Sequence, residues 1–241
     1  MISMTSFITK VFFFIFVVVL VQVNSSSSFV TPASAGCSDA ATKNVDWSDC
    51  RKRNLIISGL DFNHSNFSRT DLSSSDLRNT TLNGVLFIKS NLVRASLKGT
   101  IAHEANFNGA LASRTDFSNG DFTNSNFQKA ETFRSDFTGS NMTNVDMSRG
   151  EFGRAMFANA NLTGVNFDFS NLARADLRGA SFDEPPSFEN AFLYQARLEG
   201  LDLSKSRGLN DQQIAIACGD DKTKLPEGLT HPANWPCEHD Q

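Results

Sequence analysis

The chain has 241 residues and a formal net charge of −4, with 22 Lys and Arg against 26 Asp and Glu. This length suits one large domain or an elongated array of repeats. The modest charge excludes the basic footprint of a nucleic-acid-binding domain, and the chain is not acidic enough to imitate nucleic acid.

The first segment, residues 1–35, is predicted to be a secretory signal peptide. A lysine precedes an eleven-residue apolar run, residues 11–21, and a Ser-rich stretch then leads to the small-residue motif Ala33–Ala35. The run is shorter than the ~20 apolar residues that span a bilayer, and the motif suits signal peptidase. We expect cleavage after the motif or earlier, between residues 24 and 28. An uncleaved membrane anchor and lipidation of Cys37 are the alternatives.

Two cysteines lie on each side of a repeat array: Cys37 and Cys50 in a predicted N-terminal cap, residues 36–54, and Cys218 and Cys237 in the C-terminal segment. An even number of cysteines in an exported chain predicts disulfides, with three possible connectivities. The local pairs 37–50 and 218–237 are favoured because the array separates the two groups. A zinc site from Cys218, Cys237, His231 and His239 is the alternative, although its spacing matches no common module.

The central segment, residues 55–205, repeats every five residues. From Ile57 to Phe182, 26 consecutive positions five residues apart contain only three small residues, Ala102, Ala112 and Thr132. The residue two places earlier is usually small, and the residue one place earlier is often Asp or Asn. A period of five fits neither a strand nor a helix. After Asp183–Pro186 the phase slips by one residue, which indicates a bulge at a corner.

These small–Asp/Asn–Leu/Phe units, as in the stretch ARADLRGASF, resemble those of the pentapeptide repeat family over roughly residues 55–203. The resemblance implies an all-β fold, a right-handed quadrilateral β-helix in which four units form one coil. It also implies that the central Leu or Phe and the small residue point inward. One branch of the family protects DNA gyrase by imitating duplex DNA, which requires a cytosolic location and a strongly acidic side.

A second period of 20 supports a four-sided coil independently. One column is a predicted core ladder, and a second column is arginine. Stacked coils would make residues 20 apart vertical neighbours at about 4.8 Å. The core ladder comprises Phe67, Phe87, Phe107, Phe127, Met147 and Phe167, and the arginine column comprises Arg94, Arg114, Arg134, Arg154 and Arg174.

The volumes of the inward residues support the same four-sided coil. Ala102 and Ala112 lie ten residues apart, on opposite sides of one coil, and Phe107 and Phe117 fill the other two sides. Two large rings need two small residues across from them if the interior is to reach native packing density.

The arginine column has two interpretations. In the first it is an exposed ladder of ion pairs, because an Asp follows two residues after Arg114, Arg134 and Arg174. Each exposed pair would contribute only about 0–1 kcal/mol. In the second it is a flat docking face for an anionic partner such as a protein, a glycan or a lipid headgroup.

The C-terminal segment, residues 206–241, is predicted to begin with a short helix. Asn210 suits an N-cap with Gln213 three residues on, and Gly219 suits a stop. A proline-containing extended segment follows. We expect this helix to cap the end of the array, with a dimerisation helix as the alternative.

Catalytic motifs are nearly absent: there is no phosphate-binding loop, no HExxH and no G-x-S-x-G. His103 lies beside a carboxylate, Glu104, and we expect it to be an ordinary surface residue. We therefore expect a non-enzymatic scaffold that uses no cofactor and no metal and binds an unidentified protein or envelope partner. A bacterial periplasmic or secreted location is favoured over the thylakoid lumen. A DNA-mimicking, gyrase-protecting protein is the alternative function.

Overall fold

The computed structural model describes residues 36–237. The predicted signal peptide, residues 1–35, and His239 of the zinc alternative lie outside the described residues.

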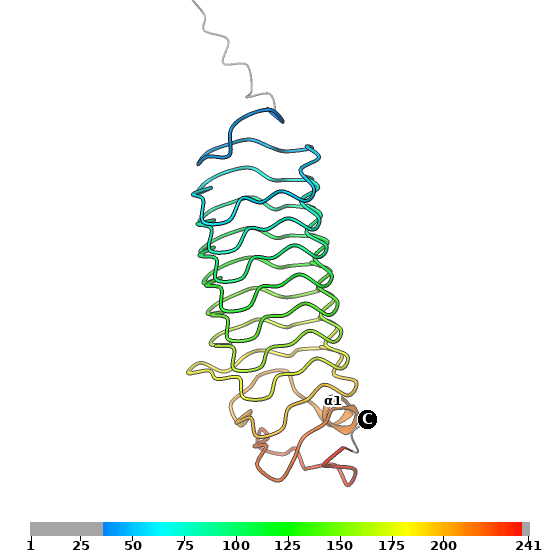
Figure 1. Cartoon of the computed structure of the whole chain (residues 1–241). Coiled ribbons are helices and arrows are strands. Elements are labelled where there is room, and N and C mark those ends of the chain that lie inside the picture. Colours follow the sequence, from blue (N-terminus) through cyan, green and yellow to red (C-terminus); the bar gives the residue numbers. More distant parts are fainter. Residues whose placement is uncertain (1–35, 238–241) are drawn as a thin grey trace, which may run out of the picture. The chain divides into compact units, whose positions relative to one another are not determined.

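The described chain winds as a stack of laps in which, up to residue 181, each residue lies beside the one 20 further along (Figure 1). Parallel bridges occur at every fifth residue, from Asp46↔Asn66 to Asn161↔Ser181, so that each lap has four sides. Every bridge in residues 36–237 is isolated, and no side extends into a longer named strand. The all-β expectation is met in this coarser form, because each five-residue side spends two residues on a turn.

The ladder extends past both boundaries expected for the array, residues 55 and 205. Its first bridge starts at Asp46, and its last joins Asp202 to Lys224. The segment expected as an N-terminal cap therefore already contains nearly half of the first lap, residues 46–54.

The preference for Asp or Asn one place before the inward residue follows from the backbone hydrogen bonds. In the unit 65–69, the N–H groups of residues 66, 67 and 69 donate to carbonyls of adjacent laps, but that of Ser68 does not. The Ser68 N–H instead donates to Asn66 Oδ1 at 3.1 Å. The same bond recurs from Ser118 to Asp116 at 3.0 Å and from Thr138 to Asp136 at 2.8 Å. The carboxylate or amide thus satisfies a donor that the ladder leaves unpaired.

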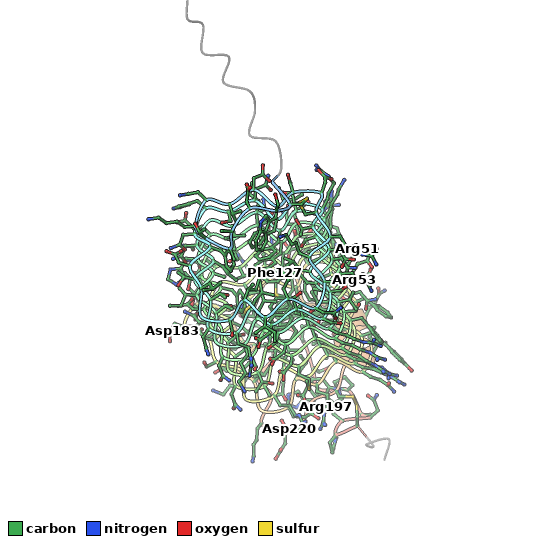
Figure 2. All side chains as sticks on the ribbon, turned by 45° about the horizontal axis from the view of Figure 1, so that its top comes forward. Arg51, Arg53, Phe127, Asp183, Arg197 and Asp220 are labelled. Atoms are coloured by element: carbon green, nitrogen blue, oxygen red, sulfur yellow. A yellow bond between two sulfur atoms is a disulfide. The ribbon has the colours of Figure 1, made fainter. Side chains whose placement is uncertain are left out.

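Large inward side chains fill the interior of the coil. All six members of the core ladder have 0% exposed area, and Phe127 lies inside the laps in Figure 2. Rings one lap apart stack, with centroids 4.7 Å apart for Phe87 and Phe107 and 4.3 Å for Phe107 and Phe127. Trp47 continues the ladder into the first lap, 5.4 Å from Phe67.

Small inward residues make room for this column of rings. Ala102 and Ala112 are buried, at 0% and 1% exposure. Between them Phe107 and Phe117 meet edge to face at 6.0 Å. The interior thus combines large and small side chains within one lap, as dense packing requires.

The extra residue near Pro185–Pro186 lengthens the lap at a single position of the ladder. Bridges up to Asn161↔Ser181 join residues 20 apart, whereas Asn166↔Ser187 and Asn171↔Phe192 join residues 21 apart. Figure 1 shows this yellow segment projecting beyond the neighbouring laps.

Both ends of the stack are covered. At the first lap, Cys37 and Cys50 form a disulfide, and Trp47 Nε1 donates to the Asp39 carbonyl at 3.2 Å. Because Cys37 is in this disulfide, its thiol is not available for lipidation.

At the other end, helix α1, Asp211–Ile216, begins at the N-cap Asn210 with a complete capping box to Gln213. The Gln213 side chain also donates to the carbonyls of Phe188 at 2.7 Å and Ala191 at 3.0 Å. A second disulfide joins Cys218 to Cys237, and Trp235 Nε1 donates to the Ala217 carbonyl at 2.7 Å. The helix therefore covers carbonyl groups that the last complete lap would leave open.

Candidate functional site: the arginine side

The described residues offer little for metal or acid–base chemistry. No group of three His, Cys, Asp or Glu within residues 36–237 is placed to hold a metal ion. The zinc alternative fails on its cysteines, because Cys218 and Cys237 are bonded to each other. His103 faces Asp121, at 3.0 Å, rather than its sequence neighbour Glu104. Within the same residues no helix has the length and apolar character to cross a bilayer.

One side of the coil carries the arginine column and is called the arginine side here. It consists of residues 50–54, 70–74, 90–94, 110–114, 130–134, 150–154, 170–174 and 191–195, and Arg51 and Arg53 mark its first lap in Figure 2. The N–H of Arg114 donates to the Phe133 carbonyl at 2.9 Å, and that of Arg134 donates to the Gly153 carbonyl at 3.0 Å. These bonds between laps hold the arginines in register.

Each column arginine occupies a corner with a left-handed backbone. Its φ is +60° at Arg94 and +59° at the other four. For a residue with a Cβ this conformation costs roughly 1–2 kcal/mol, whereas glycine adopts it freely. The next corner around the coil follows this preference, with alternating glycine and asparagine: Gly59, Asn79, Gly99, Asn119, Gly139, Asn159 and Gly179. The arginine column therefore keeps its side chains against the local backbone preference.

The ion pairs expected within this column are absent at Arg114 and Arg134. Among residues 36–237, no carboxylate pairs with Arg94, Arg114, Arg134 or Arg154, although all four are exposed. The expected partners Asp116 and Asp136 each use an oxygen to accept the backbone N–H two residues ahead. The ladder interpretation is therefore wrong for these two arginines. At the end of the column, Arg174 Nε donates to Gln195 Oε1 at 2.7 Å.

Exposed aromatic side chains gather on the same side. Phe133, Phe192 and Tyr194 are 43%, 50% and 43% exposed and lie on the arginine side, and Phe169 directly precedes it. Leu111, 41% exposed, lies one lap before Phe133 on the same side. Exposed apolar groups that collect on one surface are typical of an interaction site.

Phe133 has a defined position on this surface. Its ring lies over Gly153 of the next lap, where an added Cβ would come within 3.2 Å of the ring. The Arg134 guanidinium lies 5.2 Å from the ring centroid, within range of a cation–π interaction. The Phe133 ring therefore has Gly153 on the next lap and the Arg134 guanidinium as close neighbours.

Positive charge is concentrated along both edges of this side. From residue 89 to residue 174, the side and its two corners contain eight basic residues against Glu131 and Glu151. The basic residues are Lys89, Arg94, Arg114, Lys129, Arg134, Arg149, Arg154 and Arg174. A chain with a formal net charge of −4 therefore presents one strongly basic side.

The opposite side has a different character. Its laps include residues 120–124, 140–144 and 160–164. Their polar side chains form a ladder in which they hydrogen-bond to one another. Thr163 Oγ1 donates to Asn161 Oδ1 at 2.6 Å, and Asn161 Nδ2 donates to Thr143 Oγ1 at 3.2 Å. Asp183 projects from this side in Figure 2, away from Arg51 and Arg53. Hydrogen bonds made within the ladder leave fewer polar groups there for a partner.

The repeat pattern of the sequence does not single out the aromatic residues of the arginine side or the basic corner before it. Phe133, Tyr194, Lys129 and Arg149 lie at the two turn positions of their units, which no single unit distinguishes from ordinary variable residues. Their signal is in the same 20-residue columns that reveal the arginines.

Two family models match the sequence of this coil. One, of pentapeptide repeats (8 copies), matches residues 53–87 and 90–128, and the other, a pentapeptide repeat region, matches residues 112–185. Together they span more than half of the chain. The comparison with curated proteins gives no significant match.

Solved structures of other repeat proteins also match. HetL, involved in heterocyst differentiation regulation in the cyanobacterium Nostoc sp. strain PCC 7120, is 18% identical and matches 72% of this chain and 84% of its own, with a TM-score of 0.32. QnrB1, a plasmid-mediated fluoroquinolone resistance protein, is 18% identical over 71% and 92%, with a TM-score of 0.47. A protein of the Arabidopsis thaliana thylakoid lumen is 27% identical over 47% and 74%, with a TM-score of 0.31. All three TM-scores are below 0.5, so no function is transferred from these proteins.

Proposed function

The chain belongs to the pentapeptide repeat family, and we propose that it is an exported, noncatalytic scaffold whose arginine side binds another protein. The observation that carries this proposal is the arginine column. Four of its members are exposed and make no ion pair within residues 36–237, and all five occupy corners that favour glycine.

The shape of the surface supports binding rather than turnover of a small molecule. Enzyme substrates bind in concave, largely apolar pockets with a few convergent polar groups. The arginine side is instead a repeated surface on which the half-exposed Phe133 packs beside Gly153 of the next lap. We take the coil to be the right-handed quadrilateral β-helix that the family resemblance implies, which gives the scaffold four sides.

Export is part of the proposal. The sequence of residues 1–35 favours a signal peptide, and the two disulfides suit an oxidising compartment such as the bacterial periplasm or the extracellular space. Fractionation of cells that produce a tagged chain tests this proposal. Recovery of the unprocessed chain in the cytosol would contradict it. A basic side also argues against imitation of DNA, which needs an acidic surface.

Site-specific photocrosslinking tests the scaffold role directly. Ala173 lies on the arginine side and Ala158 on the next side, and both are half-buried alanines at the same position in their repeat units. With a photoreactive amino acid at each position in turn, we expect a discrete crosslinked protein from position 173 and none from position 158. The absence of a product from position 173 in producing cells, or an equal product from both positions, would overturn the proposed use of this side.

A further inference from the structure

The chemistry of the arginine side specifies what kind of protein surface fits it. Along the corners, exposed cations repeat at the spacing of the laps, about 4.8 Å. Between the corners lie Leu111 and Phe133, and further along lie Phe192 and Tyr194. A partner must therefore offer several carboxylates together with apolar groups.

Two glutamates on the arginine side favour a protein as its partner over a uniform polyanion. Glu131 and Glu151 lie in the middle of the basic side, and Glu151 Oε2 accepts from Asn171 Nδ2 at 2.7 Å. Both carboxylates would repel a sulfated polysaccharide or an anionic membrane laid along the side. A polypeptide can place a lysine or a backbone N–H opposite them. Phe, Tyr and Arg are also enriched where protein interfaces bind most strongly.

Resting on the proposed scaffold function, we propose that the arginine side binds an acidic protein segment that carries aliphatic or aromatic side chains. Phe133 provides the apolar contact at the centre of the surface. Arg114, Arg134 and Arg154 surround it and pair with the carboxylates of the segment.

A second copy of the chain is the strongest competing occupant. The opposite side contains Asp61, Glu104, Asp121, Asp183 and Glu184 and no Lys or Arg in its laps from residue 60 to residue 184. Contact between opposite sides of successive copies would not close, however, and would produce open-ended stacks. An acidic segment of another protein avoids this outcome.

The test uses the purified chain with both disulfides formed and two fluorescent peptides of equal length. One contains only glutamate, and in the other leucines interrupt the glutamates at regular intervals. Fluorescence anisotropy at several salt concentrations should show tighter binding of the leucine-containing peptide, with an affinity that falls as salt rises.

Variants assign the binding to this side. The triple substitution Arg114→Gln, Arg134→Gln and Arg154→Gln should weaken binding of the leucine-containing peptide by roughly tenfold or more. The matched control Lys43→Gln, Lys205→Gln and Lys222→Gln removes the same charge from exposed positions elsewhere and should leave the affinity unchanged. Phe133→Ser should abolish the preference for leucine without weakening the all-glutamate peptide. Circular dichroism and thermal unfolding establish that each variant is folded.

The other occupants give different results. Equal binding of both peptides and of heparin, with no effect of Phe133→Ser, would overturn the proposal in favour of a general polyanion site. Preferred binding to phosphatidylglycerol vesicles would overturn it in favour of a membrane. Low-salt association that light scattering detects and the triple substitution abolishes would identify a second copy.

The peptide and crosslinking experiments test separate proposals, so a negative result in one does not decide the other. A crosslinked protein from position 173 without any preference for the leucine-containing peptide would leave the scaffold role intact and overturn the acidic, apolar character of the partner. The expected peptide preference without a crosslinked protein would support the chemistry of the side and contradict its use as a scaffold in cells.

Discussion

Arg114 illustrates a conflict between backbone preference and surface chemistry at a single residue. Its φ is +59°, and its side chain is exposed without an ion pair among residues 36–237. Arg114→Gly removes a backbone cost of roughly 1–2 kcal/mol but adds about 0.4–1 kcal/mol of unfolded-state entropy. We expect the free energy of unfolding, measured by urea denaturation, to stay equal or rise by up to about 1.6 kcal/mol, while peptide binding weakens.

Gly139 provides the opposite control at the neighbouring corner. Its φ is +66°, and an added Cβ would lie 2.7 Å from Asn119 Oδ1. Gly139→Ala should therefore lower the free energy of unfolding by roughly 1–2 kcal/mol. A loss of stability in Arg114→Gly as large as that in Gly139→Ala would contradict the view that the arginine is retained for its side chain.

The interior follows ordinary packing rules, and a matched pair of substitutions tests the inward assignments. Phe127→Ala removes a ring that stacks 4.3 Å from Phe107, and it should cost roughly 3–5 kcal/mol. Ala112→Phe inserts a ring where a fully packed lap has space only for a methyl group, and it should cost roughly 1–3 kcal/mol. Negligible shifts in thermal unfolding for both variants would contradict the packing described for this lap.

At the scale of one five-residue unit, stability depends on the donor that the ladder leaves unpaired. Asn106 Oδ1 accepts the Asn108 N–H at 3.0 Å, whereas Leu86, in the same column, offers no acceptor to Ile88. Asn106→Leu should lower the free energy of unfolding by roughly 0.5–1.5 kcal/mol, and Leu86→Asn should raise it by a similar amount. Chemical denaturation checks both values, and changes of the same sign would contradict the explanation.

The two residues of the last bridge of the ladder also form an ion pair. Lys224 Nζ donates to Asp202 Oδ2 at 2.7 Å, and this bond, followed by the Ser204 hydroxyl, lowers the pKa of Asp202 from 3.8 to about 2. A depressed carboxyl pKa stabilises the folded state above the unfolded value, and the contribution is lost as the pH falls through the folded value. Local stability at this bridge should therefore decline between about pH 4 and pH 2.

Substitution of the lysine separates this ion pair from the other carboxylates. In Lys224→Met, the pKa of Asp202, followed by carboxyl NMR chemical shifts, should move up toward 3.8. An unchanged midpoint in the variant would mean that Lys224 does not lower this pKa.

Elements with a local signature are the ones that the sequence predicts well. The capping box between Asn210 and Gln213 is contained within four residues, and the coil follows from a period repeated over more than twenty units. The first lap lacks this signature, because Lys52 occupies the inward position of its second unit. Within residues 36–237 no lap lies beyond it at this position, and its half-buried side chain reaches solvent with the ammonium 4.0 Å from the Trp47 ring centroid.

At the scale of the whole coil, the columns of the arginine side follow from the period of 20, but the pairing of its charges does not. Sequence spacing places Asp116 two residues after Arg114, yet the aspartate is occupied by the Ser118 N–H. Which donor a carboxylate accepts from depends on backbone N–H groups that the ladder leaves unpaired when laps stack. The net charge of −4 also averages over sides and so conceals the basic one.

Because each lap contacts only its neighbours, the ends and the middle of the coil should respond separately to damage. The Cys218–Cys237 disulfide closes a loop of 19 residues and holds Trp235 against the Ala217 carbonyl. The double substitution Cys218→Ser and Cys237→Ser should destabilise this end by about 3 kcal/mol in the chain-entropy treatment. Hydrogen exchange should then lose protection in residues 191–218 and keep it in residues 100–160. A uniform loss of protection along the coil would mean that the stack unfolds as one cooperative unit, and the terminal cap would then support every lap.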